Sequence, residues 1–274
     1  MNEPTSRFLA GTPRLHYLEW NPAGASTLIL LHGNSANAWW WRPMAQALSG
    51  ANLRVLALDL RGHGDSEWAR PPGYSPAEYA ADLARLIPAA GAEGAIAVGH
   101  SMGGIAVLAF ASQYPWLVRA AVAIDVAITS GPRRNRFLRR LRTIPTLSYP
   151  DLATAKARFR LMPNEGEIAP ELIAEIAEHS VRRTVEGGYT MKFDRESFFG
   201  SDGVDVAATI AGVQLPLLLV RAERSRIMTA EAAANARSSN PLVEVVTIPN
   251  AHHHLPLEAP ESLACVIQQF VARL

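Results

Sequence analysis

One serine, Ser101, stands in a sequence setting that could make it a nucleophile. The apolar run before it predicts a buried strand, the run after it has helical spacing, and residues 99–103 between them read Gly-His-Ser-Met-Gly. This G-x-S-x-G pattern is typical of a sharp strand-to-helix turn that exposes the serine hydroxyl and points the N-terminus of the next helix at a developing oxyanion. Glycine is needed on both sides because a side chain there would meet the strand or the helix. The alternative is an ordinary glycine-rich turn with a surface serine.

The segments that must position Ser101 alternate between strand and helix patterns. Continuous apolar runs are typical of central parallel strands that are covered on both faces. The pair Ser75-Pro76 predicts the start of a helix over residues 74–90, as N-cap and first helical residue. Besides the strand that leads to Ser101, strands are predicted over residues 14–20, 27–31, 54–60, 120–125, 215–223 and 243–248, and helices over about 229–237 and at the C-terminal end. The sequence therefore predicts an α/β fold, with the 14–20 strand near a sheet edge.

The alternation of strand and helix patterns stops between residues 127 and 205. This segment has no strand-like apolar run, and its helix-like parts are separated by prolines. We therefore expect a helical cap at 127–205, inserted into a core domain made of residues 1–126 and 206–274. The cap begins with a basic run whose members are Arg133, Arg134, Arg136, Arg139, Arg140 and Arg142. Because these arginines fall on several helix faces, a solvated surface is favoured over a site for an anionic ligand.

Composition excludes several classes of protein. The 274 residues carry a formal net charge of +1, so no global field attracts nucleic acid or a membrane surface. The one cysteine, Cys265, excludes an internal disulfide. No apolar stretch reaches the roughly 20 residues of a membrane span, and the N-terminus lacks the pattern of a signal peptide. We expect a cytoplasmic protein with no nucleic-acid or membrane partner.

The motifs, taken in chain order, resemble those of the α/β-hydrolase fold superfamily. They are His32-Gly33-Asn34, the D-x-R-G-x-G-x-S turn over 59–66, the turn at 99–103 and a late histidine loop. The resemblance implies a mostly parallel central sheet flanked by helices, and a serine hydrolase with a helical cap. It also implies an oxyanion hole formed by the backbone amides of Asn34 and Met102 around Ser101. His63 and Asp65, in the second motif, are interpreted as structural.

The resemblance also implies which histidine serves the serine. In this family the histidine follows the last strand, five residues before a glutamate in an H-x-x-x-x-E-x-P setting. Counting back from Glu258 and Pro260 selects His253 over its neighbours His252 and His254. Three consecutive histidines could suggest a metal site, but adjacent side chains diverge and no carboxylate cluster accompanies them. Neither a metal nor a cofactor is expected.

The acid that completes a Ser-His-acid triad is the least conventional part of the sequence. Relatives carry an aspartate in the turn after the strand that precedes the histidine strand, and here that position is Ser225. Asp125, which ends the strand after the Ser101 helix, is the favoured replacement, because some branches of the family carry their acid there. Glu223 is the alternative, although it lies two residues early in its turn. Asp125 could also simply bind the next loop.

These residues predict hydrolysis of a carboxylic ester or lactone through an acyl-enzyme. A serine nucleophile differs from the carboxylate that dehalogenase or epoxide hydrolase chemistry uses. The cap is rich in Leu, Ile, Phe and Met, which indicates a largely apolar substrate of small to medium size. Three alternatives remain open: a cofactor-free dioxygenase, a cofactor-free perhydrolase, and a non-catalytic receptor that retains the pocket.

Overall fold

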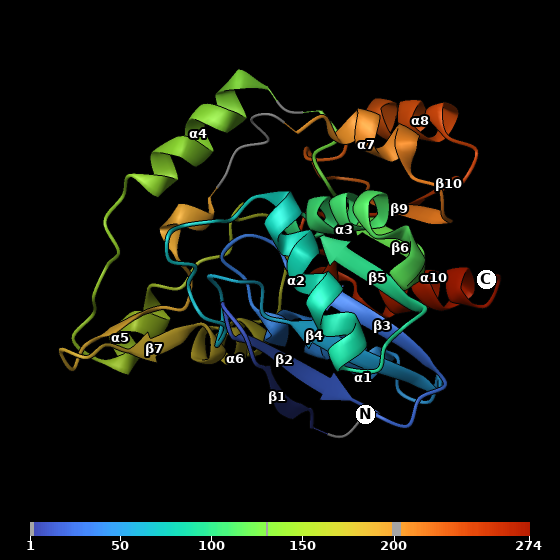
Figure 1. Ribbon diagram of the computed structural model, residues 1–274. Helices are drawn as coiled ribbons and strands as arrows, with labels where there is room; N and C mark the ends of the chain where they lie inside the picture. Colours follow the sequence, from blue (N-terminus) through green and yellow to red (C-terminus); the bar gives the residue numbers. More distant parts are fainter. Residues whose placement is uncertain (1–2, 130, 199–203) are drawn as a thin grey trace.

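A single mostly parallel sheet forms the centre of the molecule. In a computed structural model, which describes residues 3–129, 131–198 and 204–274, eight strands lie in the order β1-β2-β4-β3-β5-β6-β9-β10 (Figure 1). β2 pairs antiparallel with β1 and β4, and all other neighbours in this sheet pair parallel. The strands are β1 (Thr5–Leu9), β2 (Leu15–Trp20), β3 (Ser26–Leu31), β4 (Leu53–Leu58), β5 (Ala95–His100), β6 (Val118–Ile124), β9 (Leu217–Ala222) and β10 (Val243–Ile248). The predicted α/β fold is confirmed.

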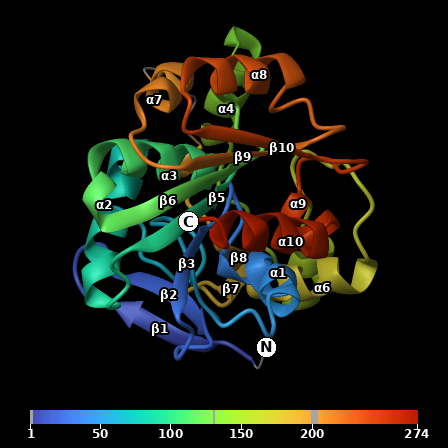
Figure 2. The same ribbon diagram turned by 90° about the vertical axis from the view of Figure 1, so that its right-hand side faces the viewer.

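Helices cover both faces of this sheet (Figure 2). Successive side chains of a strand point to opposite faces, so Ile29 and Leu31 of β3 join the core under α2, α3, α7 and α8. Leu28 and Leu30 join the core under α1, α9 and α10. The helices are α1 (Arg42–Ala47), α2 (Pro76–Ala89), α3 (Met102–Gln113), α7 (Val206–Gly212), α8 (Ala230–Ser239), α9 (Leu255–Glu258) and α10 (Pro260–Val271), with 3-10 turns η1 (Ala38–Trp41) and η2 (Pro115–Leu117).

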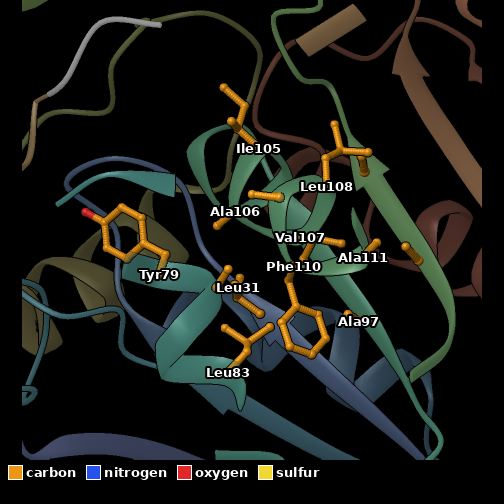
Figure 3. Packing of buried hydrophobic residues seen from close by; sticks show 14 of the residues in the cluster. Leu31, Tyr79, Leu83, Ala97, Ile105, Ala106, Val107, Leu108, Phe110 and Ala111 are labelled. Atoms are coloured by element: carbon orange, nitrogen blue, oxygen red, sulfur yellow. The ribbon is translucent and has the colours of Figure 1, made fainter. Parts of the chain in front are cut away.

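The helix that follows Ser101 is buried along most of its length. α3 is apolar on all sides, as a helix enclosed by other elements should be, and its residues from Met102 to Ala111 are all buried. Figure 3 shows Phe110 of α3 beside Leu31 of β3 and Leu83 of α2. The N-terminus of α3, and with it the turn at Ser101, is therefore held in place by packing on two sides.

The 14–20 strand lies near the edge of the sheet, as expected, but the edge strand itself was not predicted. The predicted 14–20 strand is β2, which lies second from the edge because β1 pairs outside it. β1 is almost entirely exposed. A strand without a buried face has no alternation of apolar and polar residues to reveal it.

The chain between β6 and β9 holds several small elements. They are α4 (Pro132–Arg142), α5 (Leu152–Ala157), α6 (Pro170–His179), β7 (Val181–Arg183), β8 (Tyr189–Met191) and η3 (Arg195–Ser197). The expectation of a segment without strands is wrong, because β7 and β8 pair antiparallel. Three-residue strands are too short to show a period, and the turn between them uses Gly187 at a φ of 92°. Residues 130 and 199–203, and the side chain of Arg134, which belong to the predicted cap and its basic run, lie outside the described residues.

A separate hydrophobic cluster attaches this segment to the rest of the chain. Phe159, Leu161 and Ile176 pack in one cluster with Trp40 of η1 and Leu257 of α9. α4 stands farther out, at the top left of Figure 1. Among the described residues, no helix combines the length and the apolar character that crossing a membrane requires.

Candidate active site

Ser101 occupies the turn between β5 and α3 in a strained backbone conformation. Its φ and ψ are 53° and −116°, a region that side chains other than glycine rarely adopt. The glycines on either side permit this turn. A Cβ at Gly99 would lie 2.2 Å from the carbonyl oxygen of Gly103, and a Cβ at Gly103 would lie 2.4 Å from the carbonyl oxygen of Leu31. The chain is therefore packed backbone against backbone around Ser101, and the hydroxyl lines a cavity.

His253 and Asp125 complete a hydrogen-bonded series with Ser101. The Nε2 atom of His253 lies 3.1 Å from Ser101 Oγ, and its Nδ1 atom lies 2.7 Å from Asp125 Oδ2. His253 and Asp125 are both buried. Because a carboxylate only accepts hydrogen bonds, Nδ1 is the protonated nitrogen and donates to Asp125. Nε2 then faces the serine hydroxyl as an acceptor.

Asp125 reaches His253 from the end of β6, in a backbone conformation with a φ of 45°. Its Oδ2 atom accepts a hydrogen bond from the hydroxyl of Ser225, and its Oδ1 atom accepts the amide of Ala222 at 3.4 Å. Burial raises the pKa of Asp125 to about 6, and the Ser225 hydrogen bond opposes this rise. Ser225 stands at the position where the family pattern places the acid, and here its hydroxyl donates a hydrogen bond to Asp125.

Glu223 does not reach His253. Its carboxylate is exposed and accepts the backbone amide of Asn250 at 2.8 Å, which ties the turn after β9 to the turn after β10. The structure thus brings Asp125, and not Glu223, to the histidine.

The three consecutive histidines have separate partners. The carboxylate of Glu258 accepts the amides of His252 and His254 at 2.9 and 3.1 Å, which fixes the loop register around His253. The His252 ring lies 3.2 Å from the same carboxylate, whereas His254 Nε2 donates to the carbonyl of Pro163 at 2.7 Å. Only His253 of the three turns to Ser101.

His100, which the sequence analysis did not single out, also holds this loop. It is buried, and its Nε2 atom donates to the carbonyl oxygen of His253 at 2.7 Å. Burial lowers the pKa of His100 well below the usual histidine range, so the ring is neutral. Its place as the second residue of the G-x-S-x-G pattern is the only sequence signal that pointed to it.

The amides of Asn34 and Met102 are available beside Ser101. Met102 is the first residue of α3, and the first amides of a helix have no intrahelical partner. Among the hydrogen bonds of the described residues, none uses the backbone amide of Asn34. The loop of Asn34 approaches the serine closely, since a Cβ at Gly33 would lie 3.2 Å from Ser101 Cβ. Two amides next to one hydroxyl can stabilise a negative oxygen.

The cavity in front of Ser101 is mainly apolar and has a volume of about 300 Å³. Its described lining includes Phe137, Leu138 and Leu141 of α4, with Met162 and Phe198 from later in the same inserted segment. Two charged side chains, Glu165 and Arg226, also line it.

The turn at 59–66 has a different role. Asp59 accepts the amides of Ala38 and Asp65 at 2.6 and 2.8 Å and pairs with the buried His16 ring at 2.7 Å. Burial lowers the pKa of His63 to about 3, and His63 is not among the described residues that line the cavity. His16, Asp59 and Asp65 lie close enough to hold a metal ion, but these hydrogen bonds already occupy the Asp59 oxygens. The contacts of this turn agree with the structural interpretation.

Comparison with known proteins identifies the family. A model of the alpha/beta hydrolase fold matches residues 26–260. The chain is 27% identical to 2-(acetamidomethylene)succinate hydrolase of Mesorhizobium japonicum, over 89% of this chain and 87% of that one. It is 26% identical to esterase Rv0045c of Mycobacterium tuberculosis (92% and 84% covered) and 27% identical to epoxide hydrolase A of the same organism (100% and 99%).

A solved structure leads to the same family. The crystal structure of E-2-(acetamidomethylene)succinate hydrolase matches with a TM-score of 0.85 and 29% identity, over 98% of this chain and 99% of that one. The relatives named above are all hydrolases. Sheet order, the strained serine turn and these matches agree, and the chain is an enzyme that belongs to the alpha/beta hydrolase fold family.

Proposed function

We propose that this enzyme is a serine hydrolase that cleaves a carboxylic ester or lactone through an acyl-enzyme. One observation carries the proposal: Ser101 Oγ lies 3.1 Å from His253 Nε2, while His253 Nδ1 lies 2.7 Å from Asp125 Oδ2. A histidine held in this tautomer by a carboxylate can take the serine proton, and the carboxylate stabilises the imidazolium that forms.

The reaction follows from these positions. As His253 takes its proton, Ser101 Oγ attacks the substrate carbonyl, and the oxygen that becomes negative faces the amides of Asn34 and Met102. The intermediate expels the alkoxide, which receives the proton from His253. In a lactone this alkoxide stays attached to the acyl chain. Water then attacks the acyl-enzyme with His253 as base, which releases the acid and restores Ser101.

The nucleophile favours acyl transfer over the epoxide opening named for one relative. Attack of a serine oxygen on an epoxide would leave an ether, which offers water no carbonyl carbon to attack. A carboxylate nucleophile would leave an ester, which water can hydrolyse. With a serine at position 101, we propose turnover of acyl substrates only.

We propose further that residues 127–205 act as a cap over the core of residues 1–126 and 206–274. Leu138, Leu141 and Met162 of this segment line the cavity together with Ser101 and His253 of the core. A mainly apolar cavity of about 300 Å³ suits a small to medium, largely apolar substrate.

The test is a panel of p-nitrophenyl esters of increasing acyl length, with simple lactones beside them. The wild type is expected to hydrolyse members of this panel, and Ser101→Ala is expected to fall to the background rate while keeping its circular dichroism spectrum. Ser239→Ala, which removes a serine hydroxyl at the end of α8, is the matched control and should keep wild-type turnover. Turnover by Ser101→Ala, or a folded wild type that hydrolyses neither esters nor lactones, would overturn the proposal.

A further inference from the structure

The charges in the cavity wall are few and lie on different segments. Most of the described lining residues are apolar, and the charged ones are Arg226, in the turn after β9, and Glu165, between α5 and α6. The negative charge of Glu165 acts on His254. No ion pair joins Arg226 to Glu165 or to any other carboxylate among the described residues. Among the described residues, the largely apolar wall thus carries one guanidinium, partly open to solvent, that pairs with no carboxylate.

The turn that carries Arg226 is anchored at both ends. The Ser225 hydroxyl donates to Asp125 and accepts the amide of Ile227 at 3.0 Å. The amide of Arg224 donates to the carbonyl of Ala251 at 2.9 Å. Arg226 therefore follows directly on the residue that binds the triad acid, and the backbone from which its side chain starts is held relative to Ser101.

The neighbouring arginine behaves differently. The Arg224 side chain is exposed and donates to Asn250 Oδ1 at 2.7 Å, and it is not among the described residues that line the cavity. Both arginines of this turn are exposed, but only Arg226 is among the described residues that line the cavity.

We propose that Arg226 binds a carboxylate on the substrate, at a distance from the acyl carbonyl that Ser101 attacks. A guanidinium presents paired N–H donors that match the two oxygens of a carboxylate. The Arg226 side chain is exposed, so water screens part of its charge, and the apolar residues beside it in the cavity limit that screening. The substrate class is therefore an ester or lactone with an apolar middle and a carboxylate end. This inference deepens the proposed function and rests on it.

The experiment compares esters that differ in one charge. The substrates are the mono-p-nitrophenyl esters of succinic, glutaric and adipic acids, and the matched esters in which a carboxamide replaces the carboxylate. Rates without enzyme are subtracted, because the carboxylate can itself attack a nearby ester. The readout is the ratio of kcat/KM for the carboxylate ester to kcat/KM for its carboxamide partner.

Wild type is expected to prefer the carboxylate for at least one chain length. Arg226→Gln should lower the ratio by about 10-fold, the value of a hydrogen bond to a charged group. Arg224→Gln removes the same charge from the same turn and should leave the ratio unchanged. Glu165→Gln should keep or raise it, because a carboxylate that repels the anion is lost.

Three outcomes would contradict the inference: a wild-type preference for the carboxamides, an equal ratio in wild type and Arg226→Gln, or an equal loss in Arg224→Gln. Each of these leaves hydrolysis that depends on Ser101 intact. Failure of the proposed function is a different result, since neither the carboxylate nor the carboxamide esters would then be hydrolysed.

Discussion

At the scale of single residues, the carboxylate that contacts His253 comes from a different strand end than the one where the sequence pattern of the family places it. Asp125 comes from the end of β6, and the turn after β9 provides Ser225, whose hydroxyl donates to Asp125 Oδ2. The carboxylate still lies 2.7 Å from His253 Nδ1. The chemistry requires a carboxylate at that nitrogen and does not require a particular strand to supply it.

Asp125→Asn should therefore lower kcat by about 100- to 10,000-fold with little change in KM, because an amide cannot hold the histidine tautomer or stabilise the imidazolium. Glu223→Gln, which alters only an exposed contact with the Asn250 amide, should lower kcat far less. Steady-state kinetics on one activated ester decides between them. Exchanged effects of the two variants would transfer the acid role to Glu223.

The hydrogen bond from Ser225 to Asp125 should influence how kcat/KM depends on pH. Burial raises the pKa of Asp125 to about 6, so kcat/KM should fall as the pH drops through that region and the carboxylate takes up a proton. The Ser225 bond lowers this pKa, and Ser225→Ala removes it. The acidic limb of the profile should consequently move to higher pH, while Ser225→Thr, which keeps the hydroxyl, should restore the wild-type limb. A limb that stays in place or moves to lower pH in Ser225→Ala would contradict this role.

At the scale of elements, β5 and α3 create the site by meeting almost without side chains between them. Gly103→Ala would place a Cβ 2.4 Å from the carbonyl oxygen of Leu31, a backbone atom of a central strand that cannot move aside. We expect a loss of about 3 kcal/mol in the free energy of unfolding and a parallel loss of turnover. Urea unfolding measures the change in the free energy of unfolding.

Gly212→Ala is the matched control for this change. Gly212 is the last residue of α7, and a Cβ there meets no atom within 4 Å. This variant should unfold at nearly the wild-type urea concentration. Equal stability of the two variants would show that the close approach at Gly103 does not constrain the turn.

The sequence predicted those features of the fold and the site that depend on residues close together along the chain. Apolar runs revealed the central strands, and the resemblance to the family, through its spacing from histidine to glutamate, selected His253. The hydrogen bonds from the flanking amides to Glu258 explain that spacing. β1 and the β7–β8 hairpin were missed, because an exposed strand and three-residue strands show no period. The role of His100 was missed as well, since its partner is the carbonyl of His253, far along the chain.

At the scale of the whole molecule, the cavity is made by segments that meet only in the fold. α4 contributes Leu138, the turn after β9 contributes Arg226, and the turn after β5 contributes Ser101. No sequence pattern relates these positions, so the sequence predicted an apolar substrate from the composition of the cap and gave no sign of Arg226 in the wall. The separate cluster around Trp40 and Phe159 holds the inserted segment on the core.

If the inserted segment selects substrates, shortening one of its side chains should change the preferred acyl length. Leu138→Ala enlarges the cavity and should raise kcat/KM for longer acyl esters relative to short ones, by about fourfold for each methylene that becomes buried. Arg140→Ala, an exposed change on the same helix, should leave the preference unchanged. An unaltered preference in Leu138→Ala would argue against a selective role for α4.

The central claim is that Ser101 is a nucleophile activated by His253, and covalent labelling tests it most directly. A fluorophosphonate should bond to Ser101 Oγ with loss of fluoride, and peptide mass mapping should find the adduct on the peptide that contains Ser101. His253→Ala should slow labelling by at least about 1,000-fold, whereas His252→Ala should be labelled at nearly the wild-type rate. An adduct on another serine, or rapid labelling of Ser101→Ala, would contradict the account.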